Sequence, residues 1–291
     1  MDNIVKDTIK VGKYTFSIID KTTYFRDSNI IAYRGFKIGG DYDDCINIAY
    51  VYNNGEPIEA KLPHLMYEPE CSIGSNLEKG GGSETMIKAI INYAYNKIPS
   101  ITKFYFDDMS HIDCIEKDMT KPVPRKQQKP LNLAMLSIAY NSQTWYEKYF
   151  NASMKNKELY SKYRERVSFL HDPDIKVSFE RFIEIARPPT RFFDSLETYY
   201  KSAKTYRDFF KNIPYEERCL LLLPWLENFI MYYLQGVYNN MGWEINVLDM
   251  NNKKGGSNKT RKHKKRKNIS YKNSLYPSHY KLINYIPYSM L

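Results

Sequence analysis

The hydrophobic pattern of this chain changes period at a run of three glycines, Gly80–Gly82. Before the glycines, the segments 13–20, 29–38 and 45–53 are rich in Ile, Tyr, Val and Phe and alternate in the manner of β-strands. After the glycines, apolar residues recur at helical spacing, at Met86, Ile87, Ile90, Ile91 and Ala94. The chain is therefore predicted to pass from a meander of antiparallel strands, through a glycine turn, into a helix.

Proline and capping residues set the boundaries of this unit. Segment 59–69 is a candidate fourth strand, which Pro63 weakens because proline lacks a backbone N–H. Ser83 is the predicted N-cap of the helix, and Pro99 is predicted to close it. Segment 101–108 is strand-like again, so the glycine turn is expected inside a β–loop–α–β unit.

The second half of the chain is mostly helical in its pattern. A connector rich in Pro and Lys covers 117–130, and the period of 131–140 fits a strand as well as a buried helix. A helix is expected at 142–152, followed by helical and aromatic segments from about 155 to 242. The longest apolar run, 219–234, is too short to cross a bilayer, so no membrane span is predicted.

The positive charge of the chain is concentrated in one tail. Residues 253–267 contain nine Lys or Arg and no acid, and without these nine the net charge of +10 falls to +1. Such a run is typical of a disordered arm that binds nucleic acid or another polyanion, or of a targeting signal. The candidate polyanion-binding residues are Lys259, Arg261, Lys262, Lys264, Lys265, Arg266 and Lys267.

The cysteines and the acidic residues give no sign of a metal site. The four cysteines form no C-x-x-C pair, and we expect reduced, buried thiols in an intracellular protein. The charged N-terminal decapeptide contains no secretory signal. The segment 106–114 gathers three Asp, a His and a Cys, which are ligand types, but no second cluster supplies further ligands at a recognisable spacing. No metal is therefore predicted.

The glycine turn matches two common phosphate-binding patterns poorly. A P-loop requires a Lys after the glycines, and none is present. A dinucleotide fingerprint requires G-x-G-x-x-G, whereas Ser83, Glu84 and Thr85 follow Gly82. A glycine turn that opens a helix nevertheless presents unpaired backbone N–H groups and the positive end of the helix dipole. The turn is therefore predicted to suit a pyrophosphate.

The segment 78–106 resembles the pyrophosphate loop, helix and next strand of the GNAT N-acetyltransferases. Lys79 stands before the glycines, and Gly80 and Gly82 occupy the two glycine positions of the motif. The segment 141–152 is similar to the next GNAT segment, with Asn141, Tyr146 and Phe150 as counterparts. The gap between Asn141 and Tyr146 is shorter than usual, and Tyr149 replaces the glycine that commonly precedes the Phe.

This resemblance implies a fold, a cofactor and candidate residues. The fold would be α/β (α+β), with a GNAT-like mixed, mainly antiparallel sheet, flanking helices and a mostly helical C-terminal region. Acetyl-coenzyme A would bind at Lys79, Gly80, Gly81, Gly82, Ser83 and Asn141, and Tyr146 would be the general acid. Glu68 and Glu70, just before the turn, are candidate bases for an amine acceptor that the sequence does not identify.

The pattern of glycine run, "FYFDDMSHIDC" segment and basic tail also resembles uncharacterised proteins of nucleocytoplasmic large DNA viruses. This implies a viral protein that works in the cytoplasm or nucleus of an infected cell and can be packaged in virions. The predicted parts are a GNAT-like domain at 1–152, a helical region at 153–250, a basic arm at 251–268 and a C-terminal segment at 269–291. The alternative to an acetyltransferase is a non-catalytic structural or nucleic-acid-associated protein, in which the tail carries the function.

Overall fold

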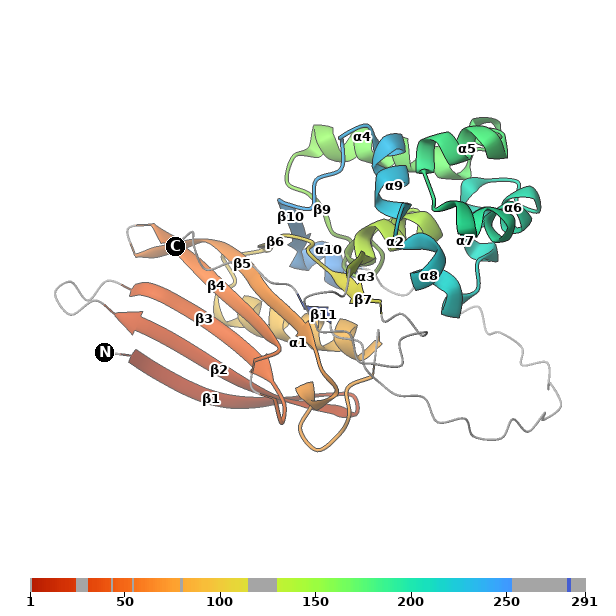
Figure 1. Ribbon diagram of the computed structural model, residues 1–291. Coiled ribbons are helices and arrows are strands. Elements are labelled where there is room, and N and C mark those ends of the chain that lie inside the picture. The colour runs from red at the N-terminus through yellow and green to blue at the C-terminus, as the bar shows by residue number, and fades with distance from the viewer. Residues whose placement is uncertain are drawn as a thin grey trace.

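The computed structural model describes residues 2–24, 31–42, 44–53, 55–78, 81–114, 130–252 and 282–283 (Figure 1). Two predicted cofactor residues, Lys79 and Gly80, lie outside these ranges. The basic arm, with all seven predicted polyanion-binding residues, also lies outside them.

The first part of the chain is an antiparallel meander. Its strands are β1 (Asp2–Val11), β2 (Tyr14–Tyr24), β3 (Ile31–Gly39), β4 (Ile46–Asn53) and β5 (Glu56–Tyr67). In β4, buried and partly buried residues alternate over the first six positions, because successive side chains point to opposite faces of a sheet. The four predicted strands are confirmed. β1 was not predicted, and it lies at the sheet edge with most of its residues exposed, which suits its charged sequence.

Strands from distant parts of the chain complete the sheet. After helix α1 (Gly81–Lys97), strand β6 (Lys103–Phe106) pairs in parallel with β5. Strand β10 (Trp243–Asn246) lies between β6 and β9 (Ser153–Met154), so the order is β1-β2-β3-β4-β5-β6-β10-β9. The described part of the chain thus forms a large mixed sheet that continues past residue 152, and α1 packs on β3 and β4 (Figure 1).

The segment after β6 forms a small separate ladder and two helices. Strand β7 (His111–Asp113) pairs with β8 (Pro130–Asn132), and helices α2 (Leu133–Asn141) and α3 (Trp145–Phe150) follow. The apolar segment 131–140 is therefore mainly a buried helix, capped by the Asn132 side chain, which accepts from the Met135 N–H. The helix predicted at 142–152 is confirmed as α3.

The remaining described helices gather beyond the β6–β10–β9 side of the sheet (Figure 1). They are α4 (Lys157–Ser168), α5 (Phe179–Ala186), α6 (Phe193–Lys201), α7 (Tyr206–Asn212), α8 (Arg218–Leu222) and α9 (Leu226–Leu234), while α10 (Val247–Asn252) contacts α1. Aromatic rings fill their core, with Phe182 at 4.8 Å from Tyr200 and 5.3 Å from Trp225, centroid to centroid. Among the described helices, none is both long enough and apolar enough to cross a membrane.

The cysteines are not free thiols, so that prediction is wrong. Cys45 is bonded to Cys71, and Cys114 to Cys219, across 26 and 105 residues of sequence. The first disulfide joins the start of β4 to the short 3-10 helix η1 (Pro69–Cys71). The second joins the end of β7 to α8. The sequence carried no signal for these pairs because the partners meet only when the sheet and the helices assemble.

Candidate functional site

The glycine turn is fastened to the sheet just before α1. The Leu77 N–H donates to the Pro69 carbonyl at 2.7 Å, and the Glu78 N–H donates to the Tyr14 hydroxyl at 3.3 Å. Lys13 forms an ion pair with the Glu78 carboxylate. The chain that enters the turn is therefore held by β2 and by η1.

The glycines of this turn are not equivalent. The Gly82 N–H already donates to the Glu78 carbonyl at 2.9 Å, and a Cβ on Gly82 would lie 2.9 Å from Leu77 Cγ. A Cβ on Gly81 would meet no described atom within 4 Å. Gly82 is thus required for packing against Leu77, whereas Gly81 faces open space at the helix N-terminus.

Ser83 lies inside the helix and does not cap it. Helix α1 begins at Gly81, so the prediction that Ser83 is the N-cap is wrong. The residue is 5% exposed, and its hydroxyl has no hydrogen-bond partner among the described residues. A buried hydroxyl in the first turn of a 17-residue helix, without a partner among the described residues, is a polar group that a ligand oxygen can satisfy.

The two candidate bases lie beside this turn. Glu70 belongs to η1 and is exposed, and Glu68, which precedes it, is partly buried. The Pro69 carbonyl between them accepts the Leu77 N–H, so the backbone of this segment lies next to the chain that leads to the glycines. A Cβ on Gly40 would lie 2.3 Å from Ser72 N, so the β3–β4 turn packs directly against the end of η1. This contact and the Cys45–Cys71 disulfide together hold η1 against the β3–β4 part of the sheet.

The parallel strands next to the turn are hydrogen-bonded over a short distance only. Their ladder consists of Ala60↔Phe104 and Lys61↔Tyr105, although β5 continues to Tyr67. At that far end, β5 pairs instead with β11 (Leu282–Ile283), which also contacts β7. The ladder stops because β6 ends at Phe106, so β5 continues beyond β6, and two C-terminal residues lie beside this continuation of β5.

The structure places the remaining predicted residues apart from the turn. Asn141 is exposed at the end of α2. Tyr146 is 4% exposed, and its ring lies 4.4 Å from that of Phe106 on β6 and 6.1 Å from that of Phe150. Lys88 of α1 stands over the Phe150 ring, at 5.9 Å. Tyr146 is thus linked to α1 through Phe150, but it is a core side chain.

A buried polar cluster that was not predicted surrounds Glu147. This carboxylate is 5% exposed and accepts hydrogen bonds from the Tyr163 hydroxyl at 2.8 Å, the Tyr160 hydroxyl at 3.0 Å and Arg164 Nη1 at 3.1 Å. It also accepts from the Thr144 N–H, which closes a capping box. Burial and the Glu147 charge raise the pKa of Tyr163 well above its ordinary value. The Thr-x-x-Glu spacing was the available signal, because it marks a capping box.

Asp108 is a second buried carboxyl group, at the end of β6. Burial raises its pKa to about 6, against hydrogen bonds from the Ser110 N–H and hydroxyl that lower it. The second oxygen, Oδ2, has no hydrogen-bond partner among the described residues, and the same holds for the Tyr238 hydroxyl. Within those residues, no group of three or more His, Cys, Asp or Glu is arranged to hold a metal ion. Cys114, a predicted ligand type, is in a disulfide.

Comparisons with known proteins found no match: no family model, no curated protein and no solved structure is similar to this chain.

Proposed function

We propose that the protein binds acetyl-coenzyme A at the glycine turn and transfers the acetyl group to an amine. The observation that carries this proposal is the short parallel ladder between β5 and β6. The ladder ends at Lys61 because β6 ends at Phe106, whereas β5 continues to Tyr67. A parallel pair that is not closed over the whole length of β5 is what the GNAT resemblance leads us to expect.

The first turn of α1 supplies the groups that a pyrophosphate requires. Backbone N–H groups at a helix N-terminus are directed at the solvent, and the helix dipole adds positive potential. Gly81 leaves its backbone accessible, and the buried hydroxyl of Ser83 has no partner among the described residues. Gly82 contributes less, since its N–H is bonded to Glu78.

In the transfer itself, the amine nitrogen attacks the thioester carbonyl carbon. The C–N bond forms, the C–S bond breaks, the amine loses a proton to a base, and the leaving thiolate gains one. Glu68 and Glu70 are the proposed bases, because they adjoin the turn through Pro69. A backbone N–H of β5 beyond Lys61, where the β6 ladder has ended, is the proposed donor to the developing oxyanion.

Two features limit the proposed reaction. Tyr146 reaches a thiolate only if the cofactor enters between the strands as far as Phe106, because its ring is buried there. β11 lies beside the far end of β5 and has to leave if the cofactor uses that edge. The pairing of β11 with β5 therefore predicts weak binding while β11 is in place.

Calorimetric titration of the full chain with acetyl-coenzyme A tests the proposal. We expect saturable heat at micromolar to millimolar ligand, and a loss of affinity of about tenfold or more in Gly81→Val, because a side chain would cover the exposed backbone. No heat at millimolar ligand would refute the proposal.

Gly82→Ala is the matched control for this titration. Its Cβ would press on Leu77, so this variant is expected to lower the thermal stability, whereas Gly81→Val is expected to keep it. Equal affinity in Gly81→Val and the natural chain would place any binding elsewhere.

The disulfides bear on where the protein works. Two disulfides are typical of oxidising environments, which include the surface of virions, rather than of the reducing cytosol. We therefore favour packaging in virions over a cytosolic role. A second candidate function, association with nucleic acid, is favoured by a groove in the helical region.

A further inference from the structure

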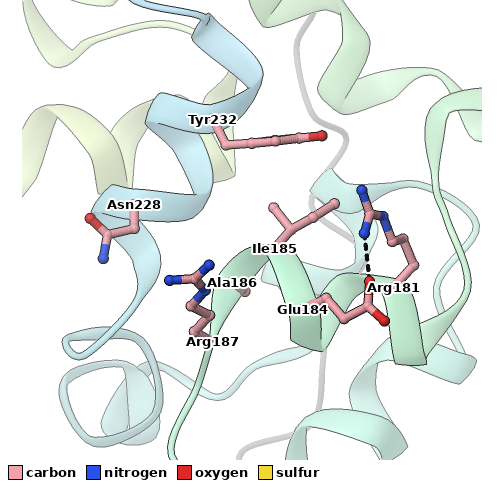
Figure 2. A pocket seen from close by; sticks show the side chains of 7 residues that line it. All are labelled: Arg181, Glu184, Ile185, Ala186, Arg187, Asn228 and Tyr232. Carbon is pink, nitrogen blue, oxygen red and sulfur yellow. Dashed lines mark hydrogen bonds and ion pairs between the residues drawn. The ribbon is translucent and has the colours of Figure 1, made fainter.

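A groove runs between helices α5 and α9, on the part of the molecule that the acetyltransferase proposal does not use. Its first hollow has a volume of about 480 Å³, and Figure 2 shows the side chains that line it. A second hollow of about 300 Å³ adjoins it, since Arg181, Ile185 and Tyr232 line both. We call the two together the α5–α9 groove.

Positive charge dominates the walls of this groove. Three guanidinium groups line it, from Arg166 on α4, Arg181 on α5 and Arg187 at the end of α5, against a single carboxylate, Glu184. Glu184 is engaged by Arg181 at 2.5 Å. Arg166 stands over the Phe169 ring at 5.3 Å. Among the described residues, none forms an ion pair with Arg166 or Arg187, so these two cationic groups remain to meet an anion.

An aromatic and an aliphatic side chain, Tyr232 and Ile185, line both hollows of the groove. Tyr232 is 51% exposed and extends from α9 over Ile185 toward Arg181 (Figure 2). Its ring contacts that of Tyr233 at 5.3 Å, and Tyr233 is itself held by a hydrogen bond to the Tyr206 hydroxyl. An exposed aromatic ring on a fixed support, in a groove lined by guanidinium groups, suits a planar base attached to a phosphate.

The backbone of the groove adds an independent observation. Arg187 and Gln235 end helices α5 and α9 in the left-handed region, with φ of +53° and +48°. Glycine or asparagine usually occupies this position, because other side chains are strained there. The chain instead places an Arg and a Gln at the two helix ends, and both side chains line the groove. Strained residues of this kind cluster at binding sites.

We propose that the α5–α9 groove binds single-stranded nucleic acid, with phosphates on Arg166 and Arg187 and a base stacked on Tyr232. The amides of Asn228 and Gln235 are then placed to meet base edges. None of the residues that line the groove belongs to the basic arm, and the proposal does not depend on the acetyltransferase proposal. A free nucleotide shares the same chemistry, so the test has to distinguish a nucleotide from a strand.

The test measures fluorescence anisotropy of a labelled 12-nucleotide single strand with the full disulfide-bonded chain. Arg187→Gly is the decisive variant, because it removes the charge and also the left-handed strain, so its thermal stability is expected to be equal or higher. We expect it to lower affinity severalfold and to reduce the slope of log affinity against log salt by about 0.7. Tyr232→Ser is expected to cost about tenfold.

Two control variants are matched to this design. Asn151→Gly replaces a left-handed helix cap outside the groove, and Lys201→Gln removes a surface charge on α6. Both are expected to leave the affinity of the single strand unchanged. The same set of variants is made in a chain lacking residues 253–267, where binding by the arm is absent.

The outcomes are distinct. Groove variants that weaken the single strand in both backgrounds, together with a photo-crosslink from a halogenated base to Tyr232, support the proposal. Binding that is lost with residues 253–267 and insensitive to Arg187→Gly overturns it. So does equal affinity for a mononucleotide and the 12-mer, which would indicate a free nucleotide as the ligand.

Discussion

In the sheet region, residues 2–106, long strands hold one another through backbone ladders, whereas in the helical region, residues 157–234, short helices are held by aromatic side chains. β1 and β2 pair over ten residue positions without a break. Helices α7 and α8 have seven and five residues, which is too short to be stable alone. The sheet is therefore stabilised largely by backbone hydrogen bonds between strands, and the helices by the packing of their aromatic side chains.

The two regions are joined by side chains from the segment between them. The Cys114–Cys219 disulfide ties β7 to α8, and Glu147 of α3 is bonded to Tyr160, Tyr163 and Arg164 of α4. The Cys45–Cys71 disulfide, in contrast, lies within the sheet region. Removing one disulfide or the other therefore tests the attachment of the helical region separately from the stability of the sheet region.

The largest expected effect is on the disulfide that ties the connecting segment to the helical region. Replacing Cys114 and Cys219 with Ala opens a loop of 105 residues, and the chain-entropy estimate is a loss of about 4–5 kcal/mol in the free energy of unfolding. Replacing Cys45 and Cys71, which are 26 residues apart, is expected to cost about 3–4 kcal/mol. Urea unfolding of the two double variants measures both. A larger loss for the Cys45–Cys71 pair would contradict this order.

The second prediction compares the two cores. Phe182→Ala in α5 is expected to cost about 3–5 kcal/mol, since the ring is fully buried among Tyr200, Phe209 and other aromatic side chains. Phe36→Ala in β3 is its counterpart, fully buried against Tyr50 and Tyr93. Native-state hydrogen exchange should show lost protection in α5–α9 for the first variant and in the sheet for the second. Uniform loss in both would show that the regions unfold together.

The third prediction concerns Asp108, at the boundary of the regions. Its pKa of about 6 exceeds the usual value of 3.8, so the folded chain binds a proton between these values more readily than the unfolded chain. Its contribution to stability is therefore complete below pH 4 and is lost as the pH rises through 6. At pH 7, Asp108→Asn should be more stable than the natural chain by up to about 3 kcal/mol.

Thermal unfolding from pH 4 to 8 measures this difference. Asp107→Asn is the control, because Asp107 accepts a hydrogen bond from the Gly242 N–H and shares the same segment. It is expected to show no such gain at pH 7. A pH-independent difference between Asp108→Asn and the natural chain would mean that Asp108 does not titrate in this range.

The smallest effect is expected for β11. Deletion of residues 282–291 removes the strand that pairs with Met66 and Tyr67, and it frees the edge of β5 beside the glycine turn. The affinity for acetyl-coenzyme A should rise by roughly threefold to tenfold, because a competing conformation is removed. Calorimetry measures the change. Unaltered affinity would mean that the cofactor does not use this edge.

The local hydrophobic pattern of the sequence predicted a large part of the sheet and the helix that begins at the glycine turn. The strands β2 to β5 and the helix after the glycines were read from their periods, because side-chain direction repeats within a few residues. β10 escaped this reading. Its first three residues, Trp243, Glu244 and Ile245, are all buried, so no alternation marks them. A four-residue strand that lies between two helices in the sequence is too short to show a recognisable pattern.

The α5–α9 groove could not be predicted for a related reason. Arg187 and Tyr232 belong to helices whose local sequences resemble ordinary amphipathic and buried helices, and only their packing places both side chains around one space. The bond between Cys114 and Cys219 is similar. A pairing across 105 residues is set by the assembled fold.

The sequence by itself determined that strands precede a glycine turn and that a helix follows it, since these features depend on neighbouring residues. Only the tertiary structure decided what each glycine does. Leu77 fills the space where a Gly82 side chain would lie, whereas the space beside Gly81 is open. The hydrogen bond from the Leu77 N–H to the Pro69 carbonyl of η1 holds Leu77 in this position. The tertiary structure likewise buried Tyr146 against Phe106, because β6 and α3 pack together. Distances between residues far apart in sequence exist only after the layers have packed, and these distances determine which groups a ligand can reach.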